Sequence, residues 1–208
     1  MTNANLPNNS LLLALEQLYK LDRDFIKIEQ LAGTLTVRSH PATFNSLIRI
    51  ILGQQLSTKV ADSIFAKLSN SIEVTPENIA ACSEADLRAV GLSRAKVNTC
   101  KAVADGILQQ TLCLDAFADL SNQSIAAQLT QIKGIGTWTA DIFLLFCLDR
   151  LDVFPASDLA IQVGYQKLKD LPTRPTAQEL VKRMESIDPY GGVAAHLLWH
   201  YYRYLNQR

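Results

Sequence analysis

The chain lacks several features that would place it in a specialised class. Its longest central hydrophobic run, Ile142 to Leu148, is only seven residues long, whereas a membrane-spanning helix needs about 20. It has no excess of one charge, because 20 Lys and Arg balance 20 Asp and Glu. This balance excludes a strongly basic, non-selective nucleic-acid coat but not a local basic patch. Residues 1–7 lack a secretory leader, so we expect a cytoplasmic protein, nucleoid-associated in a bacterium or nuclear in a eukaryote.

Cysteine is scarce, and no two cysteines are close together. The four are Cys82, Cys100, Cys113 and Cys147. None of them has the C-x-x-C spacing of zinc or iron–sulfur sites, so we expect small, buried or half-buried apolar residues. With 48% hydrophobic and 19% charged residues in 208, the chain has enough apolar material for a globular core.

Strand signals are also few, and helical periodicity predicts an all-α fold of about ten helices. Leu35-Thr36-Val37 alternates briefly without an evident partner. One predicted helix buries Phe44, Leu47, Ile48, Ile51 and Leu52. The next is capped by Ser57 and buries Val60, Ile64, Phe65 and Leu68. Thr75, Ser83 and Ser93 are expected to open further helices, and the last three cover about 158–169, 176–186 and 191–205.

The most informative segment is 129–140, where a helix ends near Thr130 and another begins at Thr137. Gly134 and Gly136 allow positive φ and a close backbone approach in the turn between them. We expect Ile135 to pack into the helix pair. Backbone N–H groups beside a helix N-terminus suit a phosphate, and Lys133 adds a charge. For the two glycines alone, a helix–turn–helix corner without a ligand is the alternative.

The fuller pattern, with Leu and Ile before the glycines and Trp-Thr-Ala after them, resembles the helix-hairpin-helix (HhH-GPD) DNA glycosylase superfamily. The match continues through residues 47–57, through 152–161 and through 188–199, which resembles the closing helix of the 3-methyladenine DNA glycosylase II (AlkA-type) branch. The resemblance implies a two-lobed fold with a DNA-binding cleft, in the compact form without the N-terminal β domain.

The implied organisation is a single glycosylase unit over residues 1–208. One lobe is formed by about 43–150, including the hairpin 124–148. The second lobe is formed by about 1–42 plus 151–208.

Asp158 is the expected catalytic residue. Ser157-Asp158 before Leu-Ala-Ile-Gln is typical of a helix N-cap, where the helix dipole favours an ionised carboxylate. The resemblance implies that this carboxylate stabilises the oxocarbenium-like charge that develops on the deoxyribose and orients the attacking water. The two roles are compatible.

Trp138 stands where bifunctional members carry a nucleophilic lysine, and without that amine no Schiff base forms with the sugar. No cysteine follows Cys147, so the four-cysteine cluster of endonuclease III-like relatives is missing. The resemblance therefore implies a monofunctional DNA glycosylase of base excision repair, which flips out alkylated purines of the 3-methyladenine and 7-methylguanine type and hydrolyses the N-glycosidic bond to leave an abasic site. The alternatives are a non-catalytic protein that binds DNA structure and a bifunctional glycosylase/AP lyase.

Trp138 and Trp199 are expected to line the base pocket, because electron-rich indole faces attract a cationic alkylated base. Ordinary core packing is the alternative for each. Ile142 stands where some relatives have a pocket aromatic, and Gly191-Gly192 where relatives commonly have an arginine. The preferred base therefore stays open.

The segment Gly53–Leu56, here the wedge loop, resembles the segment that fills the place of the extruded base. Gln55 aligns with the intercalating position and Leu56 lies beside it; the alternative is that the glutamines only satisfy loop carbonyls. The expected DNA contacts are Gln54, Gln55, Leu56, Ser57, Lys133, Gly134, Ile135, Gly136, Thr137 and Thr139. Arg88, Arg94, Lys96 and Lys101 form either a solvated face or a modest phosphate-facing patch.

No cofactor is expected, although relatives often hold Na+ or K+ at the hairpin through backbone carbonyls, here those of Thr130, Ile132 and Ile135. The expected partner is double-stranded DNA with alkylated bases. We expect a monomer with no membrane association.

Overall fold

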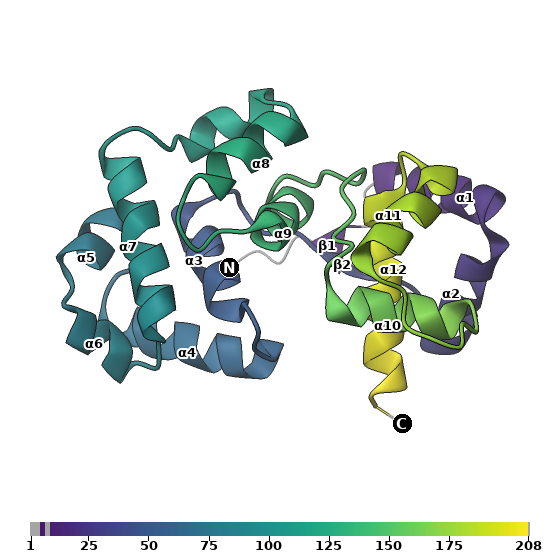
Figure 1. Cartoon of the computed structure of the whole chain (residues 1–208), viewed down its shortest axis with the longest axis horizontal. Coiled ribbons are helices and arrows are strands. Elements are labelled where there is room, and N and C mark those ends of the chain that lie inside the picture. The colour runs from purple at the N-terminus through teal and green to yellow at the C-terminus, as the bar shows by residue number, and fades with distance from the viewer. Residues whose placement is uncertain (1–4, 7–8, 208) are drawn as a thin grey trace. The chain divides into compact units, whose positions relative to one another are not determined.

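The computed structural model describes residues 5–6 and 9–207 and confirms the predicted all-α fold (Figure 1). The α-helices are α1 (Asn9–Leu21), α2 (Ile26–Ala32), α3 (Phe44–Gly53), α4 (Thr58–Ser71), α5 (Pro76–Ala81), α6 (Glu84–Ala89), α7 (Arg94–Leu108), α8 (Asn122–Thr130), α9 (Thr137–Cys147), α10 (Leu159–Leu168), α11 (Ala177–Met184) and α12 (Gly191–Leu205). Short 3-10 helices cover Arg23–Phe25, Leu114–Asp119 and Glu185–Ile187.

The strands are one short antiparallel pair, β1 (Asn5–Leu6) and β2 (Val37–Arg38), in which Leu6 lies opposite Val37. The segment Leu35–Val37, for which the sequence shows no partner nearby, thus contributes Val37 to a strand whose partner lies about 30 residues upstream. Residues 1–7, from which the absence of a leader was predicted, fall largely outside the described part of the chain. Within that part, no helix has the length and apolar character needed to cross a membrane.

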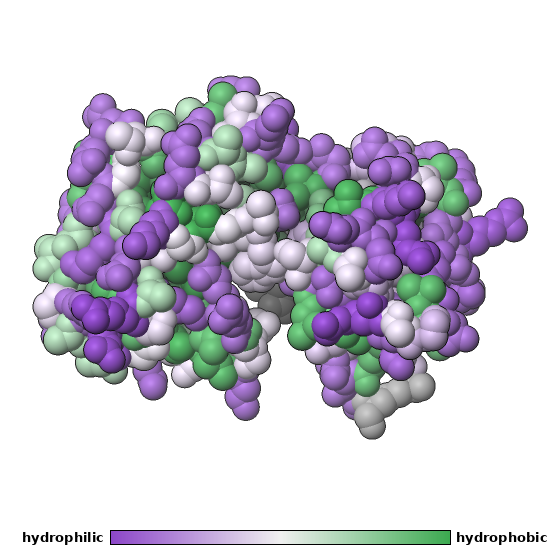
Figure 2. Space-filling view, viewed as in Figure 1, coloured by the Kyte–Doolittle hydropathy of each residue, from purple (hydrophilic) through white to green (hydrophobic). Residues whose placement is uncertain are grey.

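The chain divides into two compact units. The first combines Met1–Ser39 with Asp149–Arg208 and contains α1, α2 and α10–α12; the second is His40–Leu148 and contains α3–α9. Each unit has its own core of fully buried side chains. In the first these include Leu18, Phe25, Ile28, Ile161 and Leu197, and in the second Leu47, Ile48, Ile79, Leu87 and Phe143. Figure 2 shows a largely hydrophilic face on which hydrophobic residues form small patches.

Local sequence explains where most helices begin. Ser57, Thr75, Ser83 and Ser93 are N-caps whose side chains accept a hydrogen bond from a backbone N–H in the first turn, as predicted. Thr43, Ser121, Asp158 and Thr176 cap α3, α8, α10 and α11 in the same way. These hydrogen bonds satisfy N–H groups that have no partner inside the helix.

The buried faces agree with the predicted stripes in α3 but not fully in α4. All five predicted residues of α3 are buried. In α4, Leu68 is buried as predicted, but Val60 is 45% exposed and Ala61 takes its place in the core. Ile64 and Phe65, also predicted to be buried, are half-buried. Helix α4 packs against α3, and such packing decides which flank of an apolar stripe is covered.

The cysteines are free thiols in different environments. Cys100 and Cys147 are buried and Cys82 is half-buried, as expected for small apolar residues. Cys113 is exposed, so the expectation of burial is wrong for this residue. It immediately precedes the 3-10 helix Leu114–Asp119, whose buried residues Leu114 and Phe117 supply the apolar contact there.

Helix α10 is fixed in the first unit both along its length and at its end. It packs against α12 (Figure 1), and a Cβ at Gly164 would lie 2.9 Å from the carbonyl oxygen of Leu198. At its C-terminus, Lys169 Nζ donates to both carboxylate oxygens of Asp22 (2.7 and 2.6 Å) and to Asp24 (2.7 Å). These contacts determine where the N-terminus of α10 lies.

We expect Gly164→Ala to destabilise the protein by about 1–3 kcal/mol, because a methyl group has no room against the α12 backbone. Gly106→Ala in α7 is a matched control, since its Cβ would find ordinary contacts at 3.5 Å and alanine is the better helix former. Urea unfolding of both variants measures the difference. Equal effects at the two sites would contradict the close crossing.

Candidate active site

The carboxylate of Asp158 is held where α10 begins. Its Oδ1 accepts hydrogen bonds from the backbone N–H of Ala160 (2.9 Å) and Ile161 (3.1 Å), as predicted for an N-cap. The indole Nε1–H of Trp199 on α12 donates to the same oxygen at 3.1 Å. All three groups are donors, and a carboxylate oxygen is the acceptor that matches them. The structure thus brings two of the predicted site residues into direct contact.

The loop before Asp158 is tied to α10 by two hydrogen bonds. The N–H of Asp158 donates to the carbonyl of Pro155 at 2.9 Å, which closes a turn. Gln162 Nε2, one turn into α10, donates to the carbonyl of Ala156 at 3.0 Å. Pro155 and Ala156 are also buried. The backbone before Asp158 is therefore fixed both by packing and by its hydrogen bonds to α10.

The same loop is tied to α12 at its two glycines. The N–H of Gly192 donates to the carbonyl of Leu151 at 2.7 Å. A Cβ at Gly191 would lie 3.0 Å from the Cβ of Phe154. Phe154 therefore leaves little room for a side chain at position 191. This is a structural reason for glycine at a position where the resemblance leads one to expect an arginine.

Trp199 is half-buried, and its neighbour is an uncharged histidine. The His196 ring, one turn earlier on α12, lies edge-on to the indole with 5.9 Å between ring centroids. Burial lowers the pKa of His196 to about 4. The imidazole therefore carries no charge at neutral pH, and the indole packs against a neutral ring.

The predicted hairpin lies in the second unit, with α8 ending at Thr130 and α9 beginning at Thr137. Gly134 has a φ of +96°, and Ile135 is buried as expected. Gly136 has a φ of −99°, so of the two glycines only Gly134 uses the positive φ that both allow. A Cβ at Gly136 would meet nothing within 4 Å, so the backbone at the start of α9 faces open space.

The side chain of Gln54 joins the wedge loop to this hairpin. Its Nε2 donates to the carbonyl of Gly134 (3.1 Å) and to the hydroxyl of Thr139 (2.9 Å). Thr139, predicted to contact DNA, is only 2% exposed; its hydroxyl serves this link instead. The sequence left two roles open for Gln54, contact with DNA and a hydrogen bond to a carbonyl of the protein. The structure shows the hydrogen bond, to Gly134.

The tip of the wedge loop is exposed. Gln55 has a φ of +57°, a conformation that costs an L-residue about 1–2 kcal/mol. Leu56 is 40% exposed. The hydroxyl of Ser57, a predicted DNA contact, caps α4 by accepting from the N–H of Val60. Lys133 and Thr137 on the hairpin are exposed as well.

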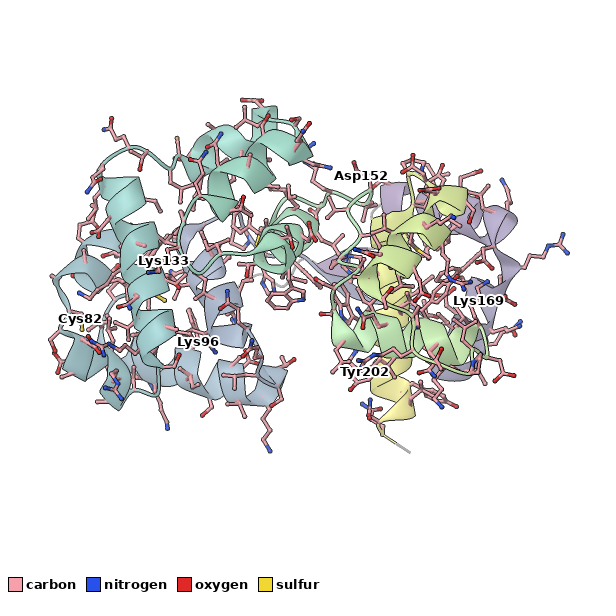
Figure 3. All side chains as sticks on the ribbon, viewed as in Figure 1. Cys82, Lys96, Lys133, Asp152, Lys169 and Tyr202 are labelled. Carbon is pink, nitrogen blue, oxygen red and sulfur yellow. The ribbon has the colours of Figure 1, made fainter. Side chains whose placement is uncertain are left out.

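The basic residues on and near α7 mostly serve the protein itself. Lys96 Nζ donates to the carbonyls of Leu52 (2.7 Å) and Gln54 (3.0 Å), and Figure 3 shows it extending from α7 toward α3. Lys101 binds two carbonyls at the end of α5 in the same manner, and Arg94 pairs with a glutamate at 3.4 Å. Burial lowers the pKa of Lys96. The two lysines therefore brace loops rather than form a solvated face or a phosphate patch.

Trp138 is half-buried on α9 of the second unit. Its helical neighbour Asp141 was not predicted as a site residue. The two residues are three positions apart, so they share a face of α9. Asp141 is half-buried, and burial raises the pKa of its carboxyl to about 6. The signal in the sequence was an acidic residue inside the otherwise apolar segment 140–148.

A metal centre built from side chains is not present among the residues that the structure describes, which contain no group of three His, Cys, Asp or Glu able to hold an ion. Of the carbonyls expected to hold an alkali ion, that of Ile132 accepts the N–H of Ile135 at 3.0 Å within the turn.

Comparison with known proteins identifies the class. Residues 48–189 match the model of the HhH-GPD superfamily base excision DNA repair proteins, and the chain belongs to this family. It is 38% identical over 161 residues to DNA-3-methyladenine glycosylase 1 of Schizosaccharomyces pombe, covering 75% of this chain and 71% of that protein.

Two solved structures support the assignment. The S. pombe 3-methyladenine DNA glycosylase Mag1, in complex with abasic DNA, matches with a TM-score of 0.83 and 35% identity over 89% of this chain and 94% of that one. A DNA-3-methyladenine glycosidase from Bacillus halodurans matches with a TM-score of 0.79 and 26% identity, covering 100% and 95% of the two chains.

We expect Asp141→Asn to stabilise the protein above pH 6 and to have little effect near pH 4. The carboxyl pKa is 3.8 for an unperturbed aspartate and about 6 here, so the folded state binds the proton more tightly and stability falls as pH rises between these values. Solvent screening of the half-buried group limits the gain to about 1 kcal/mol.

Urea unfolding of Asp141→Asn at the two pH values, with the exposed Asp105→Asn on α7 as control, measures this effect. A stabilisation that does not depend on pH would show that desolvation of the carboxylate is not its cause.

Proposed function

We propose that this protein is a monofunctional DNA glycosylase of base excision repair that removes alkylated purines of the 3-methyladenine and 7-methylguanine type from double-stranded DNA. The observation that carries the proposal is the Asp158 carboxylate, oriented by three N–H donors at the position that the family resemblance assigns to catalysis. The relatives named as 3-methyladenine glycosylases support the class of base. The protein acts as a monomer.

In the proposed reaction, the bond from C1′ of the deoxyribose to the base nitrogen breaks, and its electron pair leaves with the base. The departing base, cationic while attached, becomes neutral. Positive charge develops on the sugar, and the fixed carboxylate of Asp158 stabilises it without having to reorient. A water oxygen then bonds to C1′ and releases one proton, which leaves an abasic site.

Selectivity in this proposal comes from the charge of the alkylated base. The indole rings of Trp138 and Trp199 each present a π face that attracts a cationic base more strongly than a neutral one. Because such a base is already a good leaving group, no general acid has to protonate it. Damage recognition thus depends on stacking and on the lability of the bond.

The hairpin and the wedge loop hold the DNA in this proposal. Exposed backbone at Gly136 and Thr137, beside the N-terminus of α9, binds a phosphate with Lys133 nearby. The carbonyls of Thr130, Ile132 and Ile135 would hold an alkali ion, which would offset phosphate charge there. Gln55 and Leu56 fill the space left by the flipped base. Since Trp138 replaces the lysine nucleophile, strand cleavage does not follow base release.

We expect Asp158→Asn to lower base release about 1,000-fold while leaving DNA binding and stability nearly unchanged. Asparagine is as good an N-cap as aspartate, but it carries no charge to stabilise the sugar cation. Chromatography of bases released from dimethyl-sulfate-treated duplex measures the loss. Normal release by the variant would remove Asp158 from the catalytic role, and strand breaks without alkali would indicate a lyase.

We expect Trp199→Phe to lower kcat about 10-fold with a smaller change in KM, because it keeps an aromatic ring but removes the N–H that orients Asp158. Tyr202→Phe, which also removes one polar group from a half-buried ring on α12, is the control and should retain most of kcat. Steady-state kinetics on the same methylated duplex compares them. Equal losses in both variants would mean that the indole N–H of Trp199 has no special role.

A further inference from the structure

The wedge loop and the hairpin turn are connected by a single side chain. Gln54 is the C-cap of α3, and its Nε2 reaches both the Gly134 carbonyl and the Thr139 hydroxyl, 80 and 85 residues further along the chain. A carbonyl oxygen can only accept, so the amide must present its NH2 group here. Both N–H bonds of that group are thereby directed at the hairpin.

Helix α7 supports both segments from one face. Lys96 Nζ donates to the carbonyls of Leu52 and Gln54 and so holds the end of α3 and the start of the loop (Figure 3). Thr99, one turn further along, is buried and lies against Gly134, where any Cβ would collide with its hydroxyl. Lys96 and Thr99 are three residues apart and therefore lie on the same side of α7.

The residue that these contacts immobilise precedes the exposed tip. Gln54 is bound through its backbone carbonyl to Lys96 and through its side chain to the hairpin, and Gln55 follows with a φ of +57°. A sparsely populated backbone conformation persists only where its surroundings determine it. The hydrogen bonds of Gln54 to the hairpin and to Lys96 constrain the backbone that leads into Gln55.

We infer that Gln54 is a positioning residue that couples the wedge loop to the DNA-binding hairpin, so that Gln55 and Leu56 are held ready for insertion when the hairpin engages the backbone. The inference rests on the proposed function and goes beyond it, because Gln54 acts through the loop rather than on DNA. A loop ordered in advance does not lose conformational freedom when it enters the duplex.

The test compares a substrate in which flipping is difficult with one in which it is easy. Single-turnover excision of one 7-methylguanine is measured in a fully paired duplex and in a short unpaired bubble, where less unstacking is required. We expect Gln54→Ala to lose about 10-fold or more on the paired substrate and less than about 3-fold on the bubble. Gln54→Glu, which keeps the shape but cannot donate to Gly134, should behave similarly, and Lys96→Met should show a smaller effect in the same direction.

Gln109→Ala is the matched control, because Gln109 is the exposed C-cap of α7 as Gln54 is the C-cap of α3. It should match the wild type on both substrates. Equal loss of Gln54→Ala on paired and unpaired substrates, or no loss on either, would overturn the inference. If Gln54→Ala does not fold, as judged by thermal unfolding, Gln54→Glu and Lys96→Met are tested in its place. For each of them, the loss on the paired substrate is compared with the loss on the bubble.

A second measurement separates this inference from the proposed function. In a duplex with a tetrahydrofuran abasic analogue beside 2-aminopurine, insertion of the loop unstacks the fluorescent base without any bond cleavage. We expect saturating wild-type protein to raise the fluorescence and Gln54→Ala to give less than half of that rise. If the wild type releases no base but the fluorescence difference persists, the proposed function fails and the inference stands. Equal fluorescence with the wild type and with Gln54→Ala would contradict the inference and leave the proposed function unaffected.

Discussion

The contact between Asp158 and Trp199 depends on how closely α10 and α12 cross. Asp158 lies at the start of α10 and Trp199 one residue beyond Leu198, whose carbonyl faces Gly164 across the crossing. Their hydrogen bond is 3.1 Å long, near the upper end of the usual range, so a separation of the helices by a few tenths of an ångström weakens it. Glycine at 164 therefore helps to set the geometry of the candidate active site.

The structural demand on Asp158 and the catalytic role proposed for it coincide, whereas elsewhere such demands conflict. An N-cap must present an acceptor to two backbone N–H groups, and the proposed reaction needs a fixed carboxylate beside the sugar cation, so one side chain serves both. Gln55 and Asp141 differ, because a left-handed backbone and a desolvated carboxylate each lower stability. Such strain persists only where neighbouring contacts oppose it, as the hydrogen bonds of Gln54 and Lys96 do around the wedge loop.

The sequence predicts features that depend on nearby residues and misses those that depend on distant ones. Helix starts at Ser57 and Ser93 are local hydrogen bonds, and both were predicted. Val60 was misplaced because periodicity identifies a stripe, while the packing partner decides which flank is covered. Glycine permits positive φ without requiring it, so Gly134 and Gly136 differ. The Gln54–Gly134 bond spans 80 residues and leaves no local signal. Only the family resemblance related Asp158 to Trp199, and its catalytic role remains a prediction.

Gly134 illustrates why the wedge loop and the hairpin turn of the second unit depend on each other. Its positive φ makes the turn, its missing side chain admits Thr99, and its carbonyl receives Gln54. A side chain at this position would disturb all three at once, since the collision with Thr99 would shift the carbonyl away from the wedge loop. Conversely, a displaced wedge loop would lose the hydrogen bond from Lys96 to the carbonyl of Gln54 and those from the Gln54 side chain to the hairpin. Movement of one segment without the other therefore breaks several polar contacts at once, most of them part-buried.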